Sequence, residues 1–417
     1  MQSEEIVGTR LACVDTGSNG IRFQAAEITG PSTYNTLDYE RVPIRLGHQV
    51  FLDGRLASDT IDATVAAFSS FRERIDKLGV QHYRAVATSA VREAQNRDLL
   101  VDRLSREAGI ELEVITGSEE ARLVHVAVSS RIDLAGGTWI LVDLGGGSVE
   151  VSLVDDSGML WSESHTMGSV RLLEELSEVA NSPGNLRKLF SEYISTLRIP
   201  APAQYWEPSG FIATGGNIES LAELASARED DDGVAHLPLT DLAAAIDLLS
   251  RLSYRDRVDT LNLREDRADV ILPASLVYQK LAELSRVDQI LVPHVGVKDG
   301  LILDLASRLF SQETQEARQQ NQILQAAVSM GRRYMFDEAH GAHVAELAGS
   351  IFDQLQHVHG RSVHDRILLQ TAATLHDIGG FISIKGHHKH SLYIISRSEI
   401  PGLSKEDMHL AGHIARY

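Results

Sequence analysis

The run TWILVDLGGGSVEVSLV at residues 138–154 decides how this sequence folds. An apolar strand reaches Asp143, three glycines follow, and a second apolar strand begins at once, which predicts a hairpin with a glycine-rich turn. RLACVDTG (10–17) and IRFQAAEI (21–28) repeat this arrangement around Gly-Ser-Asn-Gly. Asp15 precedes Asp143 by 143 − 15 = 128 positions. A unit used twice predicts two related domains whose turns converge on one ligand.

Strand and helix signals alternate around these hairpins, which indicates an α/β fold with a parallel component. We expect helices near 58–78, 97–108, 118–130, 171–180, 217–226, 240–252 and 267–286, strands at 83–90, 111–116 and 210–216, and a strand, a loop and a helix over 289–307.

The composition changes after SQETQEARQQN (311–321), a polar run that we interpret as a linker or an exposed helix. Of the 17 histidines, 11 lie in residues 340–417, where helical periodicity replaces strand alternation. We therefore expect α/β domains at 1–130 and 131–310 and a helical domain at 318–417. Because the sequence stops inside an expected helix, we expect that last domain to be truncated.

Charge and cysteine content exclude several classes of protein. The 39 Lys and Arg against 58 Asp and Glu give a net charge of −19, which argues against broad binding of nucleic acid or anionic membrane. Cys13 is the single cysteine, so a disulfide scaffold is excluded. No signal peptide and no run of about 18 apolar residues is visible. We expect a cytoplasmic protein.

DLGGGSVE (143–150) is the strongest chemical signal. Three glycines let the backbone approach a ligand and present N–H groups to an anion. Asp143 is suited to hold Mg²⁺ or orient water, Ser148 to donate to a phosphate and Glu150 to serve the metal. A permissive turn with a capping Asp would explain the run equally well, but the matching DTGSN (15–19) favours phosphate binding.

A third turn, ATGGNIESL (213–221), places Gly215 and Gly216 between a strand and a helix, where backbone amides can bind an anion. Alone it is weak evidence, because a tight connection would look the same. Cations accompany these turns, and each is either a phosphate ligand or a surface ion pair. They are Arg22, Arg92, Arg122, Arg171, Arg267 and Lys298.

TGSEEARL (116–123) puts Glu119 and Glu120 in the first turn of an expected helix. The simplest explanation is that Ser118 caps the helix and the acids complement its dipole. The alternative is that one Glu acts as a general base on water. Local sequence does not separate the two explanations.

The histidine-rich segment offers a candidate metal site. A His on one helix, a His-Asp pair and a later Asp form the ligand pattern of metal-dependent phosphohydrolase domains, and His343, His376 and Asp377 fit its first part. The later Asp is not evident, because Asp407 is the only Asp after residue 377. A helical domain that keeps this frame without a metal is the alternative.

Taken in order, the motifs resemble the exopolyphosphatase / guanosine pentaphosphate phosphohydrolase family, within the superfamily of acetate and sugar kinases, actin and chaperone ATPases. They span about 10–305 and read VDTGSNGIRF, AVATSAVREA, ITGSEEARL, LVDLGGGSVEV, GSVRL, ATGGNIESLA, DRADVILPASLVY and GVKDGLILDL. TLHDIGGFISIKGHHKHSLYII (374–395) resembles the HD-like domain of longer members. The resemblance implies two duplicated ribonuclease-H-like (actin-like ATPase) α/β domains flanking a cleft, plus an all-α HD-like C-terminal domain.

The resemblance also implies chemistry. It implies an enzyme, a hydrolase of phosphoric anhydrides, in which Glu120 activates water while Asp143 and Glu150 serve Mg²⁺ (or Mn²⁺) and water. It implies a homodimer formed through the helical domains. It assigns phosphate binding to Asp15, Gly17, Ser18, Asn19, Arg92, Gly145, Gly146, Gly147, Ser148, Gly215, Gly216 and Arg267.

Gly20 and Asn217 stand where many members carry a hydroxyl residue, which leaves the substrate preference open more than the reaction. We expect an exopolyphosphatase that releases orthophosphate from inorganic polyphosphate. The alternatives are a hydrolase that converts guanosine pentaphosphate (pppGpp) to ppGpp, a regulator that binds such nucleotides without turnover, and a kinase of the same superfamily. Intact Glu120, Asp143 and Glu150 argue against the regulator.

Overall fold

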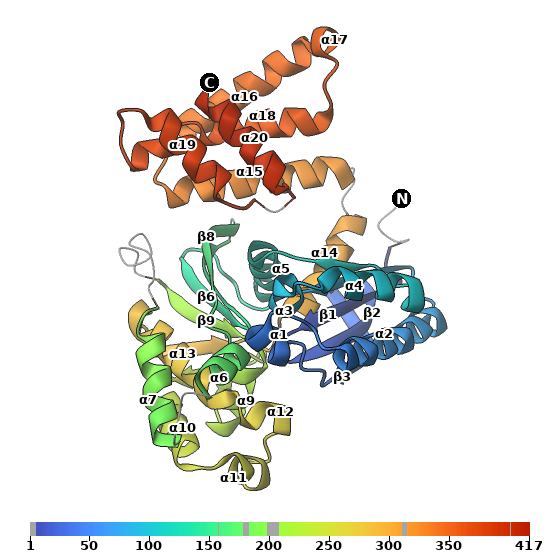
Figure 1. Ribbon diagram of the computed structural model, residues 1–417, viewed down its shortest axis with the longest axis vertical. Helices are drawn as coiled ribbons and strands as arrows, with labels where there is room; N and C mark the ends of the chain where they lie inside the picture. Colours follow the sequence, from blue (N-terminus) through green and yellow to red (C-terminus); the bar gives the residue numbers. More distant parts are fainter. Residues whose placement is uncertain (1–5, 157, 178–182, 198–207, 311–314, 401) are drawn as a thin grey trace. The chain divides into compact units, whose positions relative to one another are not determined.

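The computed structural model describes residues 6–156, 158–177, 183–197, 208–310, 315–400 and 402–417. They form two compact units (Figure 1). The first comprises Met1–Gly158 and Ser162–Ser311 and holds the α/β part of the chain. The second comprises Met159–Trp161 and Gln312–Tyr417, and from Gln315 onwards it is helical where it is described.

The first unit contains two sheets of the same design. The five-stranded sheet has the order β3-β2-β1-β4-β5, and the seven-stranded sheet has the order β10-β11-β12-β9-β6-β7-β8. In each sheet the first strand pairs antiparallel with the second and parallel with the fourth, as β1 does with β2 and β4, and β6 with β7 and β9. The predicted duplication is therefore confirmed.

The strands of the first sheet are β1 (Arg10–Gly17), β2 (Gly20–Gly30), β3 (Thr33–Val42), β4 (His82–Ala87) and β5 (Leu112–Val114). Those of the second are β6 (Trp139–Leu144), β7 (Val149–Asp155), β8 (Gly158–His165), β9 (Gly210–Thr214), β10 (Arg228–Glu229), β11 (Ala235–Pro238) and β12 (Gln289–Val292).

The strand β3 is absent from our sequence expectations. It forms an edge of its sheet and no residue along it is fully buried, so its sequence lacks the apolar alternation by which strands are recognised. The expected strand at 83–90 is shorter than predicted: β4 ends at Ala87, and Ser89 begins the short helix α3 (Ser89–Glu93).

The helices of the first unit are α1 (Gly47–Asp53), α2 (Ser58–Leu78), α3, α4 (Arg97–Arg103) with a π-turn (Leu104–Ala108), α5 (Gly117–Ser129), α6 (Ser169–Ser177), α7 (Pro183–Ile194), α9 (Gly216–Leu224), α10 (Leu239–Arg251), α11 (Tyr254–Asp259), α12 (Glu265–Ala268), α13 (Ile271–Ser285) and α14 (Val297–Phe310). The predicted helix near 171–180 corresponds to α6, and its end at 178–180 lies outside the described residues.

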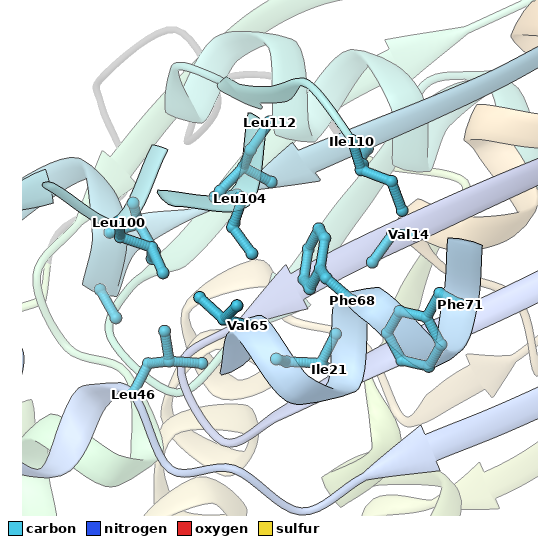
Figure 2. Packing of buried hydrophobic residues seen from close by; sticks show 14 of the residues in the cluster. Val14, Ile21, Leu46, Val65, Phe68, Phe71, Leu100, Leu104, Ile110 and Leu112 are labelled. Atoms are coloured by element: carbon cyan, nitrogen blue, oxygen red, sulfur yellow. The ribbon is translucent and has the colours of Figure 1, made fainter. Parts of the chain in front are cut away.

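The core of the first domain is centred on α2, whose apolar residues recur at helical spacing. Phe68 and Phe71 are fully buried, and Phe71 stacks on Phe23 of β2 with ring centroids 5.1 Å apart. Figure 2 shows these helix side chains among Val14, Ile21 and their neighbours. Burying a Phe contributes about 1.5–3 kcal/mol, so this contact fixes the helix against the sheet that carries the first glycine turn.

Two helices connect the sheets. The helix α5 packs on β7 of the second sheet and on α14, while α14 packs on β1 and β2 of the first (Figure 1). The end of the range expected as a second domain, 131–310, therefore lies against the first sheet. The domain boundary expected at residue 130 stays a prediction. Helix α5 precedes that boundary in the sequence but packs on β7 and α14, which follow it.

The second unit consists of α15 (Gln315–Arg333), α16 (Glu338–Gln354), α17 (Gln356–His359), α18 (Val363–Leu375), a 3₁₀ turn (Ile378–Phe381), α19 (His387–Ser396) and α20 (Lys405–Arg416). Its small core gathers Ile323, Ile367, Leu375, Ile395 and Met408. In the described part of the chain no helix is long and apolar enough to cross a membrane.

Candidate active site

Three carboxylates meet where the two sheets and α5 come together. Glu120 lies in the first turn of α5, Asp143 near the end of β6 and Glu150 near the start of β7. Each has an oxygen within 4.8 Å of the others, and the residues are only 4%, 8% and 1% exposed. Asp143 and Glu150 face each other as register partners across the β6–β7 hairpin. The structure thus brings together the three residues named as catalytic from the sequence.

Glu119 and Glu120, at the start of α5, point in different directions from the helix. The cap of this helix is Thr116, whose hydroxyl accepts the Glu119 N–H at 3.2 Å, so the expectation that Ser118 caps it is wrong. Glu119 pairs with Arg122 and Arg84. Glu120 points instead into the carboxylate group. The structure therefore separates the two residues: Glu119 is held in ion pairs, and Glu120 is the one whose position suits the proposed role of general base.

Burial raises the pKa of each of the three acids. Desolvation, and then the charge of Glu150, raise the pKa of Glu120 well above its usual range, against a lowering effect of Arg92. Burial and the Asp143 carboxylate raise the pKa of Glu150 to about 7. Burial also raises the pKa of Asp143, while a hydrogen bond from Thr214 opposes that rise. Three buried like charges are unfavourable without a cation, which is the condition that a divalent metal relieves.

Neighbouring donors hold each carboxylate in place. The Thr214 hydroxyl donates to Asp143 Oδ1 at 2.6 Å, and the Ser164 hydroxyl donates to Glu150 Oε1 at 2.9 Å. Arg92 donates to the Ile115 carbonyl at 2.7 Å and lies 3.5 Å from Glu120 Oε2. Among the described residues, Arg92 is the one cation at ion-pair distance from these acids, so most of their negative charge is unbalanced.

The first two glycine turns are in contact. A Cβ on Gly146 would lie 2.8 Å from the Ser18 Cβ, so only glycine permits this approach. The Gly145 N–H donates to the Ser148 carbonyl at 3.0 Å and closes the second turn, and Gly147 lies within it. The two hairpin turns therefore converge as the duplicated sequence predicts.

The first turn also carries its own polar contacts. Asp15 lies near the end of β1, two residues before Gly17, and accepts a hydrogen bond from Arg22 at 2.9 Å. The Ser18 hydroxyl shares a hydrogen bond of 2.9 Å with Ser89 of α3. This turn is thus tied to α3, the helix that also carries Arg92.

The third turn stands beside the acids. Gly215 follows β9 with a φ of 99°, in the left-handed region, and a Cβ there would meet Asp143 Oδ1 at 3.6 Å. Gly216 begins α9 and lies against the guanidinium of Arg267. Arg267 donates to Asn217 Oδ1 at 2.5 Å. The three predicted phosphate turns belong to one locality of the fold.

Arg267 differs from the other cations named from the sequence. All five of those lie at ion-pair distance from a carboxylate: Arg22 from Asp15, Arg92 from Glu120, Arg122 from Glu119, Arg171 from Glu93 and Lys298 from Asp299. Arg267 is 5% exposed, and within the described ranges no carboxylate lies in ion-pair distance of it. Burial, and then the charge of Arg22, lower its pKa to about 10. A buried cation of this kind favours an anionic ligand.

The donor set fits a divalent cation. Carboxylate oxygens are the ligands that Mg²⁺ and Mn²⁺ prefer, and three buried acids offer one oxygen each within a small sphere. Asp143 and Glu150 are the residues that would hold it, as expected from the sequence.

The second unit assembles a different cluster. His376 and Asp377 come together with His340, and the exposed His343 is not part of this group. His340 and His343 are three positions apart on α16, so spacing alone did not choose between them. The sequence expectation is corrected here from His343 to His340.

Several residues around the acids escaped the sequence analysis. Thr214 meets Asp143 because the two are partners in the parallel pairing of β9 with β6, a register that one sequence does not reveal. Ser164 reaches Glu150 from β8, a strand that we did not predict. Thr214 itself could have been predicted to donate to a carboxylate, because its hydroxyl lies at a strand end directly before the glycine turn at Gly215.

Duplicated domains whose glycine turns meet beside buried carboxylates define an actin-like α/β protein that handles phosphoryl groups. Comparison with known proteins agrees. The model of the Ppx/GppA phosphatase family matches residues 26–309, and that of Ppx/GppA phosphatase, domain III, matches residues 323–417. The chain therefore belongs to the Ppx/GppA phosphatase family, whose members act on phosphoric anhydrides.

Relatives in this family carry two kinds of name. Exopolyphosphatase 2 of Mycobacterium tuberculosis is 31% identical over 72% of this chain and 99% of its own length. A guanosine-5′-triphosphate,3′-diphosphate pyrophosphatase of Vibrio campbellii is 26% identical over 97% of this chain and 80% of its own. An exopolyphosphatase structure from Cytophaga hutchinsonii superposes with a TM-score of 0.66 at 25% identity, covering 72% of this chain and 98% of that one.

Proposed function

We propose that this protein is an exopolyphosphatase that hydrolyses the terminal phosphate of inorganic polyphosphate with the help of Mg²⁺ or Mn²⁺. The observation that carries the proposal is the buried set of Glu120, Asp143 and Glu150 beside the glycine turns. The relative named exopolyphosphatase, 31% identical over 99% of its own length, supports polyphosphate as the substrate.

In this mechanism Glu120 orients a water molecule and takes its proton as the water oxygen attacks phosphorus. Its raised pKa, caused by burial and then by Glu150, makes its carboxylate a stronger base than an exposed Glu. Arg92, 3.5 Å away, stabilises the ionised form. The new P–O bond forms in line as the bond to the chain breaks, and the shortened polyphosphate leaves.

Other residues bind and orient the phosphate. The backbone N–H groups of Gly146, Gly147 and Gly216 and the Arg267 guanidinium stabilise its equatorial oxygens. A divalent cation on Asp143 and Glu150, when bound, would neutralise charge that develops on the phosphate oxygens.

A second candidate is hydrolysis of guanosine pentaphosphate (pppGpp) to ppGpp, because the Vibrio relatives that match 97% of this chain carry that name. It uses the same residues on a different leaving group. A binding protein without turnover is the third candidate, and an unpaired Arg267 alone would serve it. The predicted homodimer and the exclusion of nucleic acid as a partner stay predictions, and molar mass in solution tests the first.

The experiment measures phosphate release by the full chain with Mg²⁺, offered long-chain polyphosphate and pppGpp in parallel. Glu120→Gln should lower kcat by about 10²–10⁴-fold, the usual contribution of a general base. Glu119→Gln is the matched control, since its partners are Arg84 and Arg122, and it should leave kcat nearly unchanged while lowering stability.

Each outcome distinguishes the candidates. Release from polyphosphate that is lost only in Glu120→Gln supports the proposal. Release only from pppGpp replaces it with the second candidate. Binding without release from either substrate moves the protein to the third, and equal losses in both variants would overturn the role of Glu120.

A further inference from the structure

Two arginines, one near the end of β3 and one just beyond it, reach the segment that carries Arg267. Arg41 donates through Nη2 to the Asp266 carboxylate. Arg45 donates to Asp269 Oδ2 at 2.7 Å. Asp266 directly precedes Arg267 in α12, and Asp269 follows that helix. Because β3 belongs to the first sheet, while α12 leads into α13, which packs on β9 of the second, these ion pairs cross between the two halves of the unit.

The guanidinium of Arg41 also reaches the first glycine turn. Its Nη2 donates to the Asn19 carbonyl at 2.9 Å, and the Asn19 side chain donates to the Asp266 carbonyl at 2.8 Å. The side chains of Arg41 and Asp266 are 10% and 12% exposed, so dissolved salt screens their attraction only a little. Arg41 therefore ties the turn that follows β1 to the residue next to Arg267.

Gly20 leaves the space into which Arg41 extends. A Cβ on Gly20 would lie 2.9 Å from Arg41 Nη2 and 3.1 Å from Arg41 Cζ. These atoms are the far end of a flexible side chain, so a larger residue at position 20 would displace the guanidinium. The glycine that stands where many family members carry a hydroxyl residue is thus the residue that lets a cation approach this turn.

More positive than negative charge surrounds this contact. Arg22 and Arg41 are register partners across β2 and β3, where like charges repel each other. Asp266 accepts from Arg41, and its other oxygen lies 3.6 Å from Arg264 Nε. Burial, and then the charges of Arg22 and Arg264, lower the pKa of Arg267. Because one carboxylate serves two of these arginines and Arg267 has none at ion-pair distance in the described chain, the group as a whole attracts an anion.

We propose that Arg41 is a positioning residue that sets where Arg267 meets a phosphate, and that Arg45 supports α12 from its other end. The hydrogen bonds of Arg41 lead to the first phosphate turn and to the helix of Arg267. The inference rests on the proposed function in taking a phosphate as the ligand of Arg267. Because such a contact acts on substrate binding in the ground state and the transition state alike, its loss changes KM more than kcat.

The experiment measures phosphate release from long-chain polyphosphate with Mg²⁺ and, in the Glu120→Gln background, the Kd of inorganic tripolyphosphate by calorimetry. Arg41→Ala should raise KM and Kd by at least about tenfold, the usual contribution of a hydrogen bond to a charged group, and change kcat by less than about threefold. Arg41→Lys keeps the charge and should recover part of the affinity. Arg74→Ala is the matched control, because the partners of Arg74 are Asp38 and Glu40 of β3 itself. It should lower Tm and leave Kd within about twofold.

A second pair of variants separates positioning from stability. Gly20→Ser should displace the Arg41 guanidinium and weaken binding in the same direction as Arg41→Ala. In the double variant the serine should cost no further affinity, because no guanidinium is left to displace. Additive losses would show that the two substitutions act independently, and they would overturn the proposal.

Circular dichroism of each variant shows whether it is folded. Affinity that is lost in Arg41→Ala, partly regained in Arg41→Lys and kept in Arg74→Ala supports the proposal. An unchanged Kd in folded Arg41→Ala overturns it, as does equal weakening in Arg74→Ala, and Gly20→Ser decides in the same way if Arg41→Ala does not fold. Binding of tripolyphosphate without phosphate release by the unmodified protein refutes the proposed function alone, and the ratios of Kd then decide about Arg41. Absence of binding overturns both.

Discussion

The contact between α14 and α5 should control the reaction from a distance, and Gly300→Ala tests this. A Cβ at Gly300 would lie 2.0 Å from the Leu123 carbonyl oxygen and 2.6 Å from its carbonyl carbon. Both atoms belong to the backbone of α5, less than one turn beyond Glu120. The new methyl group has no flexible side chain to displace, so the helices themselves must separate.

The size of the effect follows from these distances. Ordinary contact begins near 3.4 Å, so about 1.4 Å of local separation is needed from 2.0 Å. Overpacking of this kind costs about 1–3 kcal/mol, more than the roughly 1 kcal/mol that Ala gains over Gly inside a helix. A shift of about 1 Å in Glu120 relative to Asp143 and Glu150 can lower kcat by about 10²-fold.

Phosphate release and thermal unfolding of Gly300→Ala should be measured beside Gly296→Ala. A Cβ on Gly296 meets nothing within 4 Å, so this control adds the same methyl group near the start of the same helix without a clash. We expect a large loss of kcat and a lower Tm only in Gly300→Ala. A folded Gly300→Ala with the kcat of the control would refute the view that α14 positions α5.

Three further predictions concern the buried acids and their neighbours. Without metal, burial and Asp143 raise the pKa of Glu150 to about 7, so the folded state keeps a proton that the unfolded chain releases near 4.5. The unfolding free energy should therefore fall, by up to about 3 kcal/mol, as the pH rises from 4.5 to 7, and urea unfolding in EDTA should show a flatter profile for Glu150→Gln. Thr214→Val removes the 2.6 Å donor to Asp143 and should raise the Mg²⁺ concentration for half-maximal phosphate release about tenfold, and an unchanged Mg²⁺ titration would contradict this role. Tyr278→Phe loses a buried hydrogen bond of 2.8 Å to the Thr214 carbonyl and should cost about 1 kcal/mol in urea unfolding with little change in kcat, whereas a large fall in kcat would place the hydroxyl in the reaction.

The repeated hairpins could be predicted because each is specified by neighbouring residues. Each consists of an apolar run, an acid, glycines and a second apolar run. The sequence did not predict β3, whose edge position leaves its pattern polar, nor the packing of α14 on the first sheet. The position of α14 is decided by contacts across nearly 300 residues, between its own residues and β1. Periodicity within one segment carries no information about such a partner.

The same distinction applies to the site. Glu120, Asp143 and Glu150 were found because each belongs to a local motif, and the structure brings them together. The different surroundings of Glu119 and Glu120 could not be predicted without knowing which way each side chain points from α5. That direction depends on where the helix begins, and its cap is Thr116 instead of Ser118. The exchange of His343 for His340 has a similar origin, since neighbouring positions on one helix differ only in the direction that tertiary packing gives them.

The charges at the active site are separated in a way that stability alone does not explain. Glu120, Asp143 and Glu150 lie together with one nearby cation, while Arg267 is buried with no carboxylate at ion-pair distance in the described chain. Pairing opposite charges within the protein would stabilise the fold more, because a buried unpaired charge is costly. In the proposed function, a phosphate would balance the charge of Arg267 and a divalent cation would balance the charge of the three acids. The arrangement therefore lowers the unfolding free energy of the ligand-free protein and favours binding of phosphate and metal. Binding of these ligands should raise the unfolding free energy by mass action.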